Sequence, residues 1–254
     1  MKLKIKRFDL QKNPHSKIEE FEVKHDETIL NSLIEIKTQQ DNTLTYRCGC
    51  RTGICGSCSI KVNGVERLAC KTHLTQDDLI EPINNSKVIR DLVVDLSHEE
   101  KFLKNSKTYL KKQSNEEITT KDEKLIDLQS NCILCQSCFS SCPVYEVNKE
   151  FLGPYALTRA LRYVNDKKEA NTLDIINSIQ DNGVWDCTLC GNCTLVCPQF
   201  IDPKTDIMNL RMKSVQAGLE DKSFSQFRQG FDSGFDSGFD TGFNPSGGFN
   251  PNGF

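Results

Sequence analysis

Hydrophobic and polar residues alternate at the start of the chain and then change to a helical spacing. The stretches "LKIKR" (3–7) and "FEVKH" (21–25) put their apolar residues at every second position, which predicts two β-strands. Between residues 26 and 39 the apolar residues recur on one helical face, with Asp26 or Thr28 as the expected N-cap. The residues in these patterns are Leu3, Ile5, Phe21 and Val23 for the strands and Ile29, Leu33 and Ile36 for the helix.

A β-hairpin is predicted in the stretch "SIKVNGVERL" (59–68). Asn63-Gly64 lies between two short runs of β-type residues, and this dipeptide favours the two-residue turns that join antiparallel strands. A strand pair, a helix and a hairpin in this order indicate a small α+β domain.

Later segments predict helices, because their apolar residues recur at three- and four-residue intervals. We expect these residues to pack in a core. They are Leu157, Ala160, Leu161 and Val164, then Leu173, Ile176 and Ile179, and finally Ile207 and Leu210.

These patterns divide the chain into an α+β domain (1–100), an all-α domain (101–225) and a tail (226–254). A polar, lysine-rich stretch (104–124) reads as a linker or surface segment, so we expect the boundary near Leu96 to Lys107. The tail is a degenerate Gly-Phe repeat, whose glycines oppose regular structure, and it is expected to be disordered. The alternative is a segment whose phenylalanines dock on a partner or a membrane.

Composition and charge exclude several classes of protein. The net charge of −3 argues against a nucleic-acid binder, which would need a basic surface. No apolar run approaches the roughly 18 residues of a membrane span, and the N-terminus lacks the apolar core of a signal peptide. We therefore expect a chain made in the cytoplasm without its own export signal, which reaches a membrane only through a partner.

Thirteen cysteines are unusual in such a chain, and they fall into two groups. Five lie between residues 48 and 70, and eight lie between residues 132 and 197. Disulfides are disfavoured in a reducing compartment, so metal binding is the better interpretation.

The first group has the spacing C-x4-C-x2-C-x11-C, which is that of plant-type [2Fe–2S] proteins. Its ligands would be Cys50, Cys55, Cys58 and Cys70. Gly53 and Gly56 permit the tight loop that this needs, and the predicted hairpin would bring the last cysteine back beside the third. Zinc is the less favoured metal, because it prefers paired C-x2-C knuckles. Cys48 is left over, either as a free thiol or with a redox or alternative-ligand role.

The second group consists of two runs of C-x2-C-x2-C-x3-C-P, the bacterial ferredoxin pattern, in which the fourth cysteine binds the other cluster. One [4Fe–4S] cluster is therefore assigned to Cys132, Cys135, Cys138 and Cys197. The other is assigned to Cys142, Cys187, Cys190 and Cys193. If Cys190 were a spare thiol, the second cluster would be [3Fe–4S]. Trp185 precedes this run and is expected to shield a cluster, with stacking on a quinone as the alternative.

The whole pattern resembles the iron–sulfur subunit of succinate dehydrogenases and fumarate reductases. The stretches "CRTGICGSC", "LACKTHL", "VIRDLVVDL", "CILCQSCFSSCP" and "VCPQFIDP" carry the resemblance, over Met1 to about Val215. It implies a β-grasp [2Fe–2S] domain, followed by an α-helical ferredoxin domain with two cubane-type clusters. It also implies an oxidoreductase subunit that relays electrons between the FAD of a flavoprotein partner, where substrate chemistry occurs, and a quinone near the membrane.

Departures from the family pattern point to its non-classical members. Classical members lack a cysteine at the position of Cys190, and they have aromatic residues where Glu146 and Val147 stand and often a histidine where Thr188 stands. The pattern is closer to methylmenaquinol:fumarate reductases, whose membrane-associated partner is cysteine-rich and resembles heterodisulfide reductase. The alternatives are a thiol:fumarate reductase subunit, or a subunit that serves another flavoprotein dehydrogenase.

The expected location is peripheral, on the bacterial inner membrane through partner subunits. The cytoplasmic face is the default, and the periplasmic face is the alternative if the chain is exported with its flavoprotein. The sequence shows no nucleophile–base pair and no phosphate-binding loop, so we expect no catalytic residue in this chain. Physiological direction, in anaerobic respiration or in the tricarboxylic acid cycle, is left open.

Overall fold

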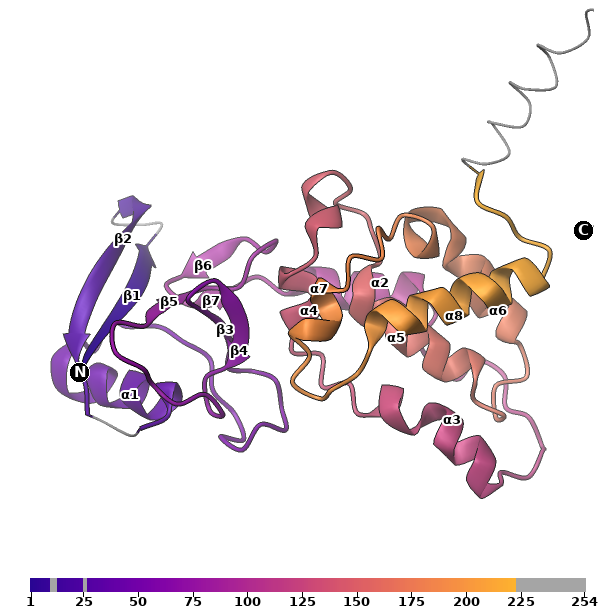
Figure 1. The fold of residues 1–254 in the computed structure, drawn as a ribbon, viewed down its shortest axis with the longest axis horizontal. Coiled ribbons are helices and arrows are strands. Elements are labelled where there is room, and N and C mark those ends of the chain that lie inside the picture. The colour runs from indigo at the N-terminus through magenta and orange to yellow at the C-terminus, as the bar shows by residue number, and fades with distance from the viewer. Residues whose placement is uncertain (10–12, 25–26, 223–254) are drawn as a thin grey trace, which may run out of the picture. The chain divides into compact units, whose positions relative to one another are not determined.

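A mixed β-sheet and one helix form the first part of the chain (Figure 1). The computed structural model describes residues 1–9, 13–24 and 27–222, and Met1–Ala217 form one compact unit. The sheet has the strand order β4-β3-β5-β1-β6-β7, and β2 also pairs with β1. Its strands are β1 (Lys2–Asp9), β2 (Asn13–Glu22), β3 (Ser59–Val62), β4 (Val65–Leu68), β5 (Leu79–Glu81), β6 (Val88–Arg90) and β7 (Val93–Val94).

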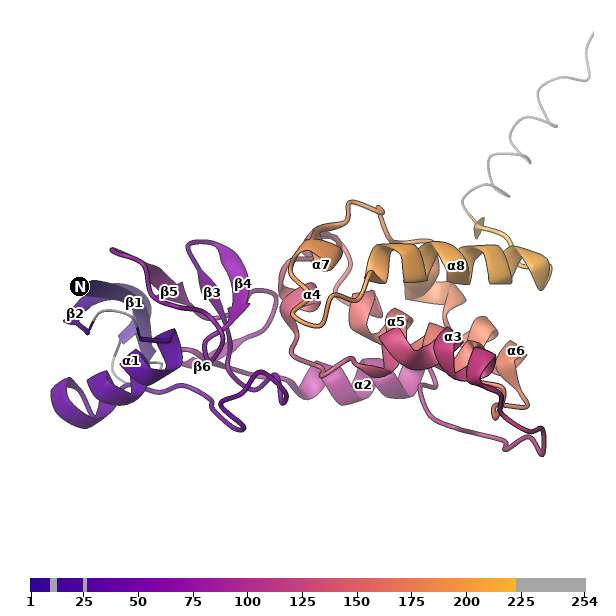
Figure 2. The ribbon, with the colours of Figure 1, turned by 60° about the horizontal axis from the view of Figure 1, so that its bottom comes forward.

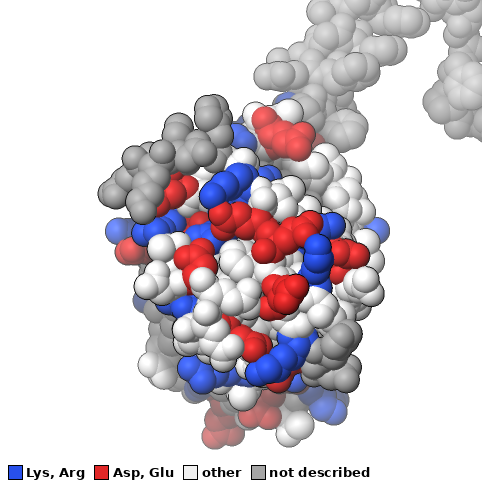
Figure 3. All heavy atoms as spheres, turned by 90° about the vertical axis from the view of Figure 1, so that its left-hand side faces the viewer, with Lys and Arg blue, Asp and Glu red and all other residues white. Residues whose placement is uncertain are grey.

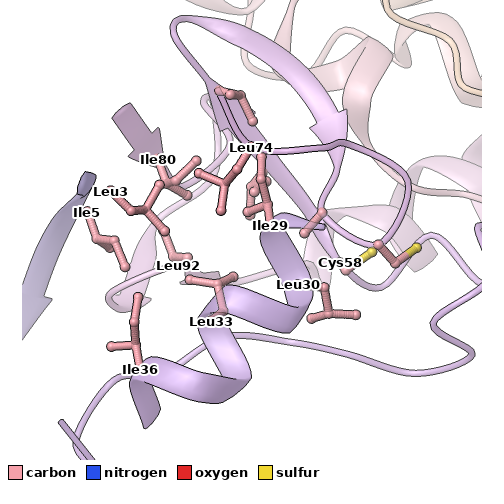
Figure 4. Close-up of a cluster of buried hydrophobic side chains, with 14 of the residues drawn as sticks. Leu3, Ile5, Ile29, Leu30, Leu33, Ile36, Cys58, Leu74, Ile80 and Leu92 are labelled. Atoms are coloured by element: carbon pink, nitrogen blue, oxygen red, sulfur yellow. The ribbon is translucent and has the colours of Figure 1, made fainter. Parts of the chain in front are cut away.

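Helix α1 (Ile29–Glu35) packs its apolar face against this sheet (Figure 4). Leu3 and Ile5 of β1 are fully buried beside Leu33 of the helix and Ile80 of β5. Cys58 belongs to the same buried cluster, so a predicted ligand is anchored in the core. The alternation predicted for the first strand is confirmed.

The predicted helix is shorter as an α-helix than the pattern suggested. Thr28 is the N-cap, as expected, and its hydroxyl accepts a hydrogen bond from the Asn31 amide at 3.3 Å. After Glu35 the chain continues as a π-helix, η1 (Ile36–Gln40). The Thr38 hydroxyl donates to the Ile34 carbonyl at 2.9 Å, and such back-bonding competes with the regular helix ladder.

The two hairpins differ in how well the sequence predicts them. Asn63 and Gly64 have φ values of 50° and 82°, and they join β3 to antiparallel β4 as predicted. Strand β2 instead begins eight residues before Phe21, where the predicted alternation starts. Even the apolar Ile18 of this strand is 59% exposed, so burial does not impose an alternating pattern there. Val23, just beyond the strand, is buried as expected.

Helices form the remainder of the unit (Figures 1 and 2). Helix α5 is buried along most of its length and packs against α8, as both views show. The helices are α2 (Ser97–Asn105), α3 (Thr120–Ser130), α4 (Ser137–Ser140), η2 (Pro143–Glu146), α5 (Gly153–Val164), α6 (Thr172–Ser178), η3 (Gln180–Val184), α7 (Asn192–Leu195) and α8 (Pro203–Gln216).

Most of the predicted helical core is buried, with one correction in α6. Leu173 is 58% exposed, whereas Ile175, which the pattern did not select, is buried beside Ile176. A seven-residue helix has too few turns for its spacing to define the buried face, so neighbouring elements decide it. The other predicted core residues are buried: Leu157, Ala160, Leu161, Val164, Ile179, Ile207 and Leu210.

Helix α2 spans the position where the sequence divides the first two domains. Its Phe102 is buried, and the ring stacks on Tyr145 with centroids 6.3 Å apart, so the helix packs with the helical part. The division into three domains remains a prediction. The tail from residue 226 lies outside the described residues.

Polar contacts join the sheet and the helices. The Asn85 amide donates to the carbonyls of Phe139 at 2.8 Å and Cys142 at 3.2 Å. The Ser140 hydroxyl donates to buried Glu66 at 2.6 Å and accepts from the Asn84 amide at 2.8 Å. The hairpin and helix α4 are thereby held together.

Candidate functional site

Backbone amides converge on the sulfur of Cys50 in the loop before β3. The amides of Thr52, Ile54 and Cys55 donate to its Sγ at 3.4, 3.3 and 3.3 Å. Hydrogen bonds from the Thr52 side chain and then from these amides lower the pKa of Cys50 to about 6. The loop therefore favours the thiolate, which is the form that binds iron.

Glycine is required where this loop turns and where it approaches the helical part. Gly53 and Gly56 have φ values of +84° and +72°, as expected for a tight loop. A Cβ on Gly56 would lie 2.9 Å from both Cα and Cβ of Cys135. Two loops that carry predicted ligands of different clusters are therefore in direct backbone contact.

The hairpin brings Cys70 back beside Cys58. The Ala69 amide donates to the Cys58 carbonyl at 3.0 Å, directly beyond the paired Ser59 and Leu68. Both thiols are buried, and burial, together with the charge of Cys70, raises the pKa of Cys58 to about 12. The charge of Cys55 also acts on Cys58, so the four cysteines form an exposed pair next to a buried pair.

Cys48 is exposed on the same loop. Burial raises the pKa of Tyr46, and the charge of Cys48 adds to this rise. Nearby Arg47 donates to the Val94 carbonyl at 2.9 Å and so anchors the loop to β7.

Four cysteines of the helical part line one small cavity. They are Cys132, Cys135, Cys138 and Cys197. Burial raises the pKa of Cys138 well above its usual range, and the charges of the other three add to this effect. Cys197 is the last cysteine of the second run, yet it lines the same cavity as the first three cysteines of the other run.

The remaining four cysteines interact with one another in the same way. Burial raises the pKa of Cys142 to about 11, and the charges of Cys187 and Cys190 raise it further. Burial raises the pKa of Cys193 to about 12, and Cys187, Cys142 and Cys190 again contribute. Cys190 is the exposed member of this group.

The two runs share a backbone conformation that the sequence did not reveal. Leu134 and Gln136 have φ values of 52° and 65°, and the matching Leu189 and Gly191 have 55° and 84°. Each left-handed pair precedes a four-residue helix, α4 or α7. Only Gly191 signals this geometry, because leucine and glutamine rarely adopt it.

Backbone amides also approach the sulfurs of the two runs. The Leu189 amide donates to Cys187 Sγ at 3.3 Å, and the matching Leu134 amide lowers the pKa of Cys132 against the larger effect of burial. Since thiolates in buried cavities need such donors or a bound cation, the donor set fits iron–sulfur clusters. Within the described ranges, no three His, Cys, Asp or Glu side chains are grouped closely enough to hold a single metal ion.

Three positions at which the sequence was expected to depart from the classical pattern are exposed. Glu146 and Thr188 are exposed, and Val147 is 88% exposed. Trp185 is half-buried, and its indole N–H donates to Gln180 at 2.9 Å. Arg211 lies over the Trp185 ring at 5.6 Å and donates to the Cys187 carbonyl at 2.7 Å. Trp185 is therefore fixed beside the second run.

Two family models match successive parts of the chain. One, described as a 2Fe-2S iron-sulfur cluster binding domain, matches residues 2–101, and the other, a 4Fe-4S dicluster domain, matches residues 129–201. The fumarate reductase iron-sulfur subunit of Haemophilus influenzae is 35% identical over 82% of this chain and 90% of its own length. The chain belongs to the iron–sulfur subunits of fumarate reductases and succinate dehydrogenases.

Other members of this family support the same conclusion. The 8-methylmenaquinol:fumarate reductase iron-sulfur subunit of Wolinella succinogenes is 35% identical over 86% of this chain and 74% of its own length. A chain of the Mycobacterium smegmatis Sdh1 complex, solved in the apo form, has a TM-score of 0.74 at 26% identity, with coverage of 85% of this chain and 95% of that chain.

Membership confirms the resemblance and the fold class read from the sequence. This iron–sulfur subunit is a component of an oxidoreductase complex, with a [2Fe–2S] domain followed by a [4Fe–4S] dicluster domain. No helix among the described residues has the length and apolar character needed to cross a membrane.

Proposed function

We propose that this subunit relays electrons between the FAD of a flavoprotein partner and a quinone-reactive membrane partner, as part of a non-classical menaquinol:fumarate reductase. It would hold three clusters, which supply one-electron transfer when bound. The observation that carries the proposal is the grouping of Cys190 with Cys142, Cys187 and Cys193.

The proposed ligands follow the groups of cysteines described above. A [2Fe–2S] cluster is assigned to Cys50, Cys55, Cys58 and Cys70. The first [4Fe–4S] cluster is assigned to Cys132, Cys135, Cys138 and Cys197, and the second to Cys142, Cys187, Cys190 and Cys193.

The neighbouring sites support a relay in sequence. Gly56, next to Cys55, touches Cys135 of the next site. Cys138 of that site and Cys193 of the last site interact electrostatically. These contacts support an order in which the three proposed sites would follow one another, and electron transfer over a long distance requires such a chain of neighbouring sites.

The last site supports the non-classical assignment. Cys190 supplies a fourth thiol, which favours [4Fe–4S] over [3Fe–4S]. The exposed Glu146 and Val147 stand in place of the aromatic residues of the classical quinone pocket. We therefore propose that quinone chemistry takes place on a cysteine-rich membrane partner. The subunit would lie on the inner membrane through this partner, on the cytoplasmic face unless it is exported with the flavoprotein.

Anaerobic purification of the complex with its partners tests this proposal. We expect low-temperature EPR of the oxidised complex to show no [3Fe–4S] signal. We also expect menaquinol analogues to serve as electron donors for fumarate reduction by the complex. A stoichiometric [3Fe–4S] signal in intact protein would restore the classical type. Fumarate reduction with thiols alone as donor would favour a thiol:fumarate reductase, and a flavoprotein partner inactive on succinate and fumarate would overturn the proposal.

A further inference from the structure

Tyr155, in the first turn of α5, has a buried hydroxyl without a protein partner. The side chain is 1% exposed, and its hydroxyl forms no hydrogen bond with any described residue. Buried tyrosine hydroxyls nearly always have a partner, because an unpaired one costs about 1–3 kcal/mol. The missing acceptor is therefore expected to be a group other than the protein.

Tyr155 lines the cavity formed by the cysteines that are proposed to bind the first [4Fe–4S] cluster. It shares this cavity with all four cysteines proposed for that cluster. Burial raises the pKa of Tyr155, and the charges of Glu99, Cys138 and Cys132 raise it further. Tyr155 therefore interacts electrostatically with two of the proposed ligands, Cys132 and Cys138, with which it also lines the cavity.

Neighbouring rings hold Tyr155 in this orientation. The rings of Phe139 and His98 meet it nearly edge-on, with centroids 6.3 and 6.5 Å away. His98 is itself stacked on Phe139 at 4.0 Å. These contacts keep the ring buried in the wall of the cavity.

Glu99 is not the acceptor of the Tyr155 hydroxyl, and Tyr145 is a less suitable donor to this cavity. Glu99 accepts a hydrogen bond from the Gln136 amide at 2.7 Å, and none joins it to Tyr155. Tyr145 also has an unpaired buried hydroxyl, but this lies against the backbone of Gly153, where a Cβ would be 1.8 Å away. Tyr145 does not line the cavity.

We infer that the Tyr155 hydroxyl donates a hydrogen bond to a sulfur of the cluster in this cavity, an inference that rests on the proposed cluster assignment. A donor at a cluster sulfur stabilises the reduced state, which is the more negative one, and so raises the reduction potential. Tyr155 would then tune the middle site of the relay without being one of its ligands.

The test compares Tyr155→Phe with Tyr163→Phe in the anaerobic complex that contains the full chain. Tyr163 lies on the same helix, is half-buried and stacks on Arg162 at 4.5 Å, away from the cavity. Redox titration followed by EPR gives the potential of each cluster. Proton ENDOR in H₂O and D₂O detects exchangeable protons coupled to the cluster. A Cys132→Ser variant identifies which signal belongs to this cluster.

We expect Tyr155→Phe to lower the potential of this cluster and to remove one exchangeable proton coupling, with iron content unchanged. Tyr163→Phe should change neither. An unchanged potential and coupling in Tyr155→Phe, with the cluster present, would overturn the inference and leave the cluster assignment intact. Absence of the cluster signal from the wild-type complex, or its persistence unaltered in Cys132→Ser, would instead overturn the assignment.

Discussion

Cys190 differs from its three neighbours in its exposure. Cys142 and Cys193 are buried and Cys187 is half-buried, whereas Cys190 faces outward at the edge of the group. Exposed thiolates are the ones that oxidants reach first. The corner of the second cluster at Cys190 should therefore be the most easily lost.

Replacement of Cys190 by alanine should convert the second cluster to [3Fe–4S]. The remaining three thiols hold three irons, and the fourth iron has no protein ligand. We expect EPR of the oxidised Cys190→Ala complex to show a stoichiometric [3Fe–4S] signal that the wild type lacks. Cys48→Ala is the matched control, since it also removes an exposed cysteine and should leave the spectrum unchanged. Equal spectra for both variants would exclude Cys190 as a ligand.

At the scale of single residues, the spacing of the cysteines could be read from the sequence, whereas the side chains and backbone conformations around them could not. The spacing of each run predicts a grouping in which the first three cysteines share a cluster and the fourth binds the other one. The structure places Cys197 in one cavity with Cys132, Cys135 and Cys138, in agreement with this pattern. The spacing was not sufficient to find Tyr155, because one tyrosine in a helix has no distinctive spacing. The left-handed backbone conformation of Leu134 and Leu189 was also not predicted. Leucine has no local preference for it, so the loop that carries the cysteines must impose it.

Arg7 ties the strands of the first domain to the loop that leads to Cys50. Its guanidinium donates to Asp91 at 2.9 Å, to Glu19 at 2.7 Å and to Asp41. Asp91 is 2% exposed and also accepts from the Thr45 amide at 2.8 Å. One buried cation therefore connects β1, β2 and the segment just before the cluster loop.

Arg7→Met should destabilise this domain by about 3–5 kcal/mol, because it leaves a buried carboxylate without its cation. Urea unfolding, followed by loss of the visible absorption of the [2Fe–2S] site, measures this. Lys2→Met is the control, since it removes an exposed pair with Glu20 and should cause no measurable change. Similar unfolding midpoints for the two variants would contradict the role given to Arg7.

The effect of Arg7→Met should not depend on pH between 6 and 8. Burial raises the pKa of Asp41, but hydrogen bonds from Thr43 and Arg7 outweigh this and lower it to about 2. A carboxylate whose pKa is lowered on folding contributes its full stabilisation at pH values above its pKa in the unfolded chain, which is near 4. This stabilisation is lost as the pH falls through the pKa of the folded state, so it is constant between pH 6 and 8. A difference between wild type and variant that changes between pH 6 and 8 would point to another titrating group.

Elements with a strong local signal were predicted, and those formed by tertiary pairing were not. Asn63-Gly64 and Thr28 determine a turn and a cap through their own backbone and side-chain chemistry. The early part of β2 and the exposed Leu173 depend on what lies opposite them in the fold. Figure 3 shows basic and acidic residues interspersed on one face of the molecule. Separately, Lys2 pairs with Glu20 at 3.1 Å between β1 and β2, and Lys24 pairs with Glu35 of α1 at 3.0 Å.

One of the contacts between the sheet part and the helical part lies at a glycine beside a predicted ligand. A Cβ added to Gly56 would lie 2.9 Å from Cys135 and 2.9 Å from the carbonyl oxygen of Ile133. Gln199, just beyond Cys197, also donates to the Gly53 carbonyl at 3.3 Å. The distance between the first two cluster sites is thus controlled by contacts between their own loops.

Gly56→Ala should separate these two sites and slow electron transfer between them. A methyl group there would overlap Cys135, and tunnelling falls steeply with distance. Gly64→Ala is the matched control, because φ is also positive there, at +82°, but no atom lies within 4 Å. Rapid freeze-quench EPR should show slower transfer and weaker spin–spin coupling in Gly56→Ala alone. Equal rates in the two variants would show that this contact does not set the rate.

The interleaved order of the cysteines has a consequence for biosynthesis. A ribosome releases all four ligands proposed for the [2Fe–2S] site once Cys70 has emerged. Under the proposed assignment the middle cluster must wait for Cys197, and the last one needs Cys142 from the earlier run. Neither half of the helical domain can mature alone, so the delivery of iron and sulfide to both cubanes becomes a late, shared step after translation of the second run.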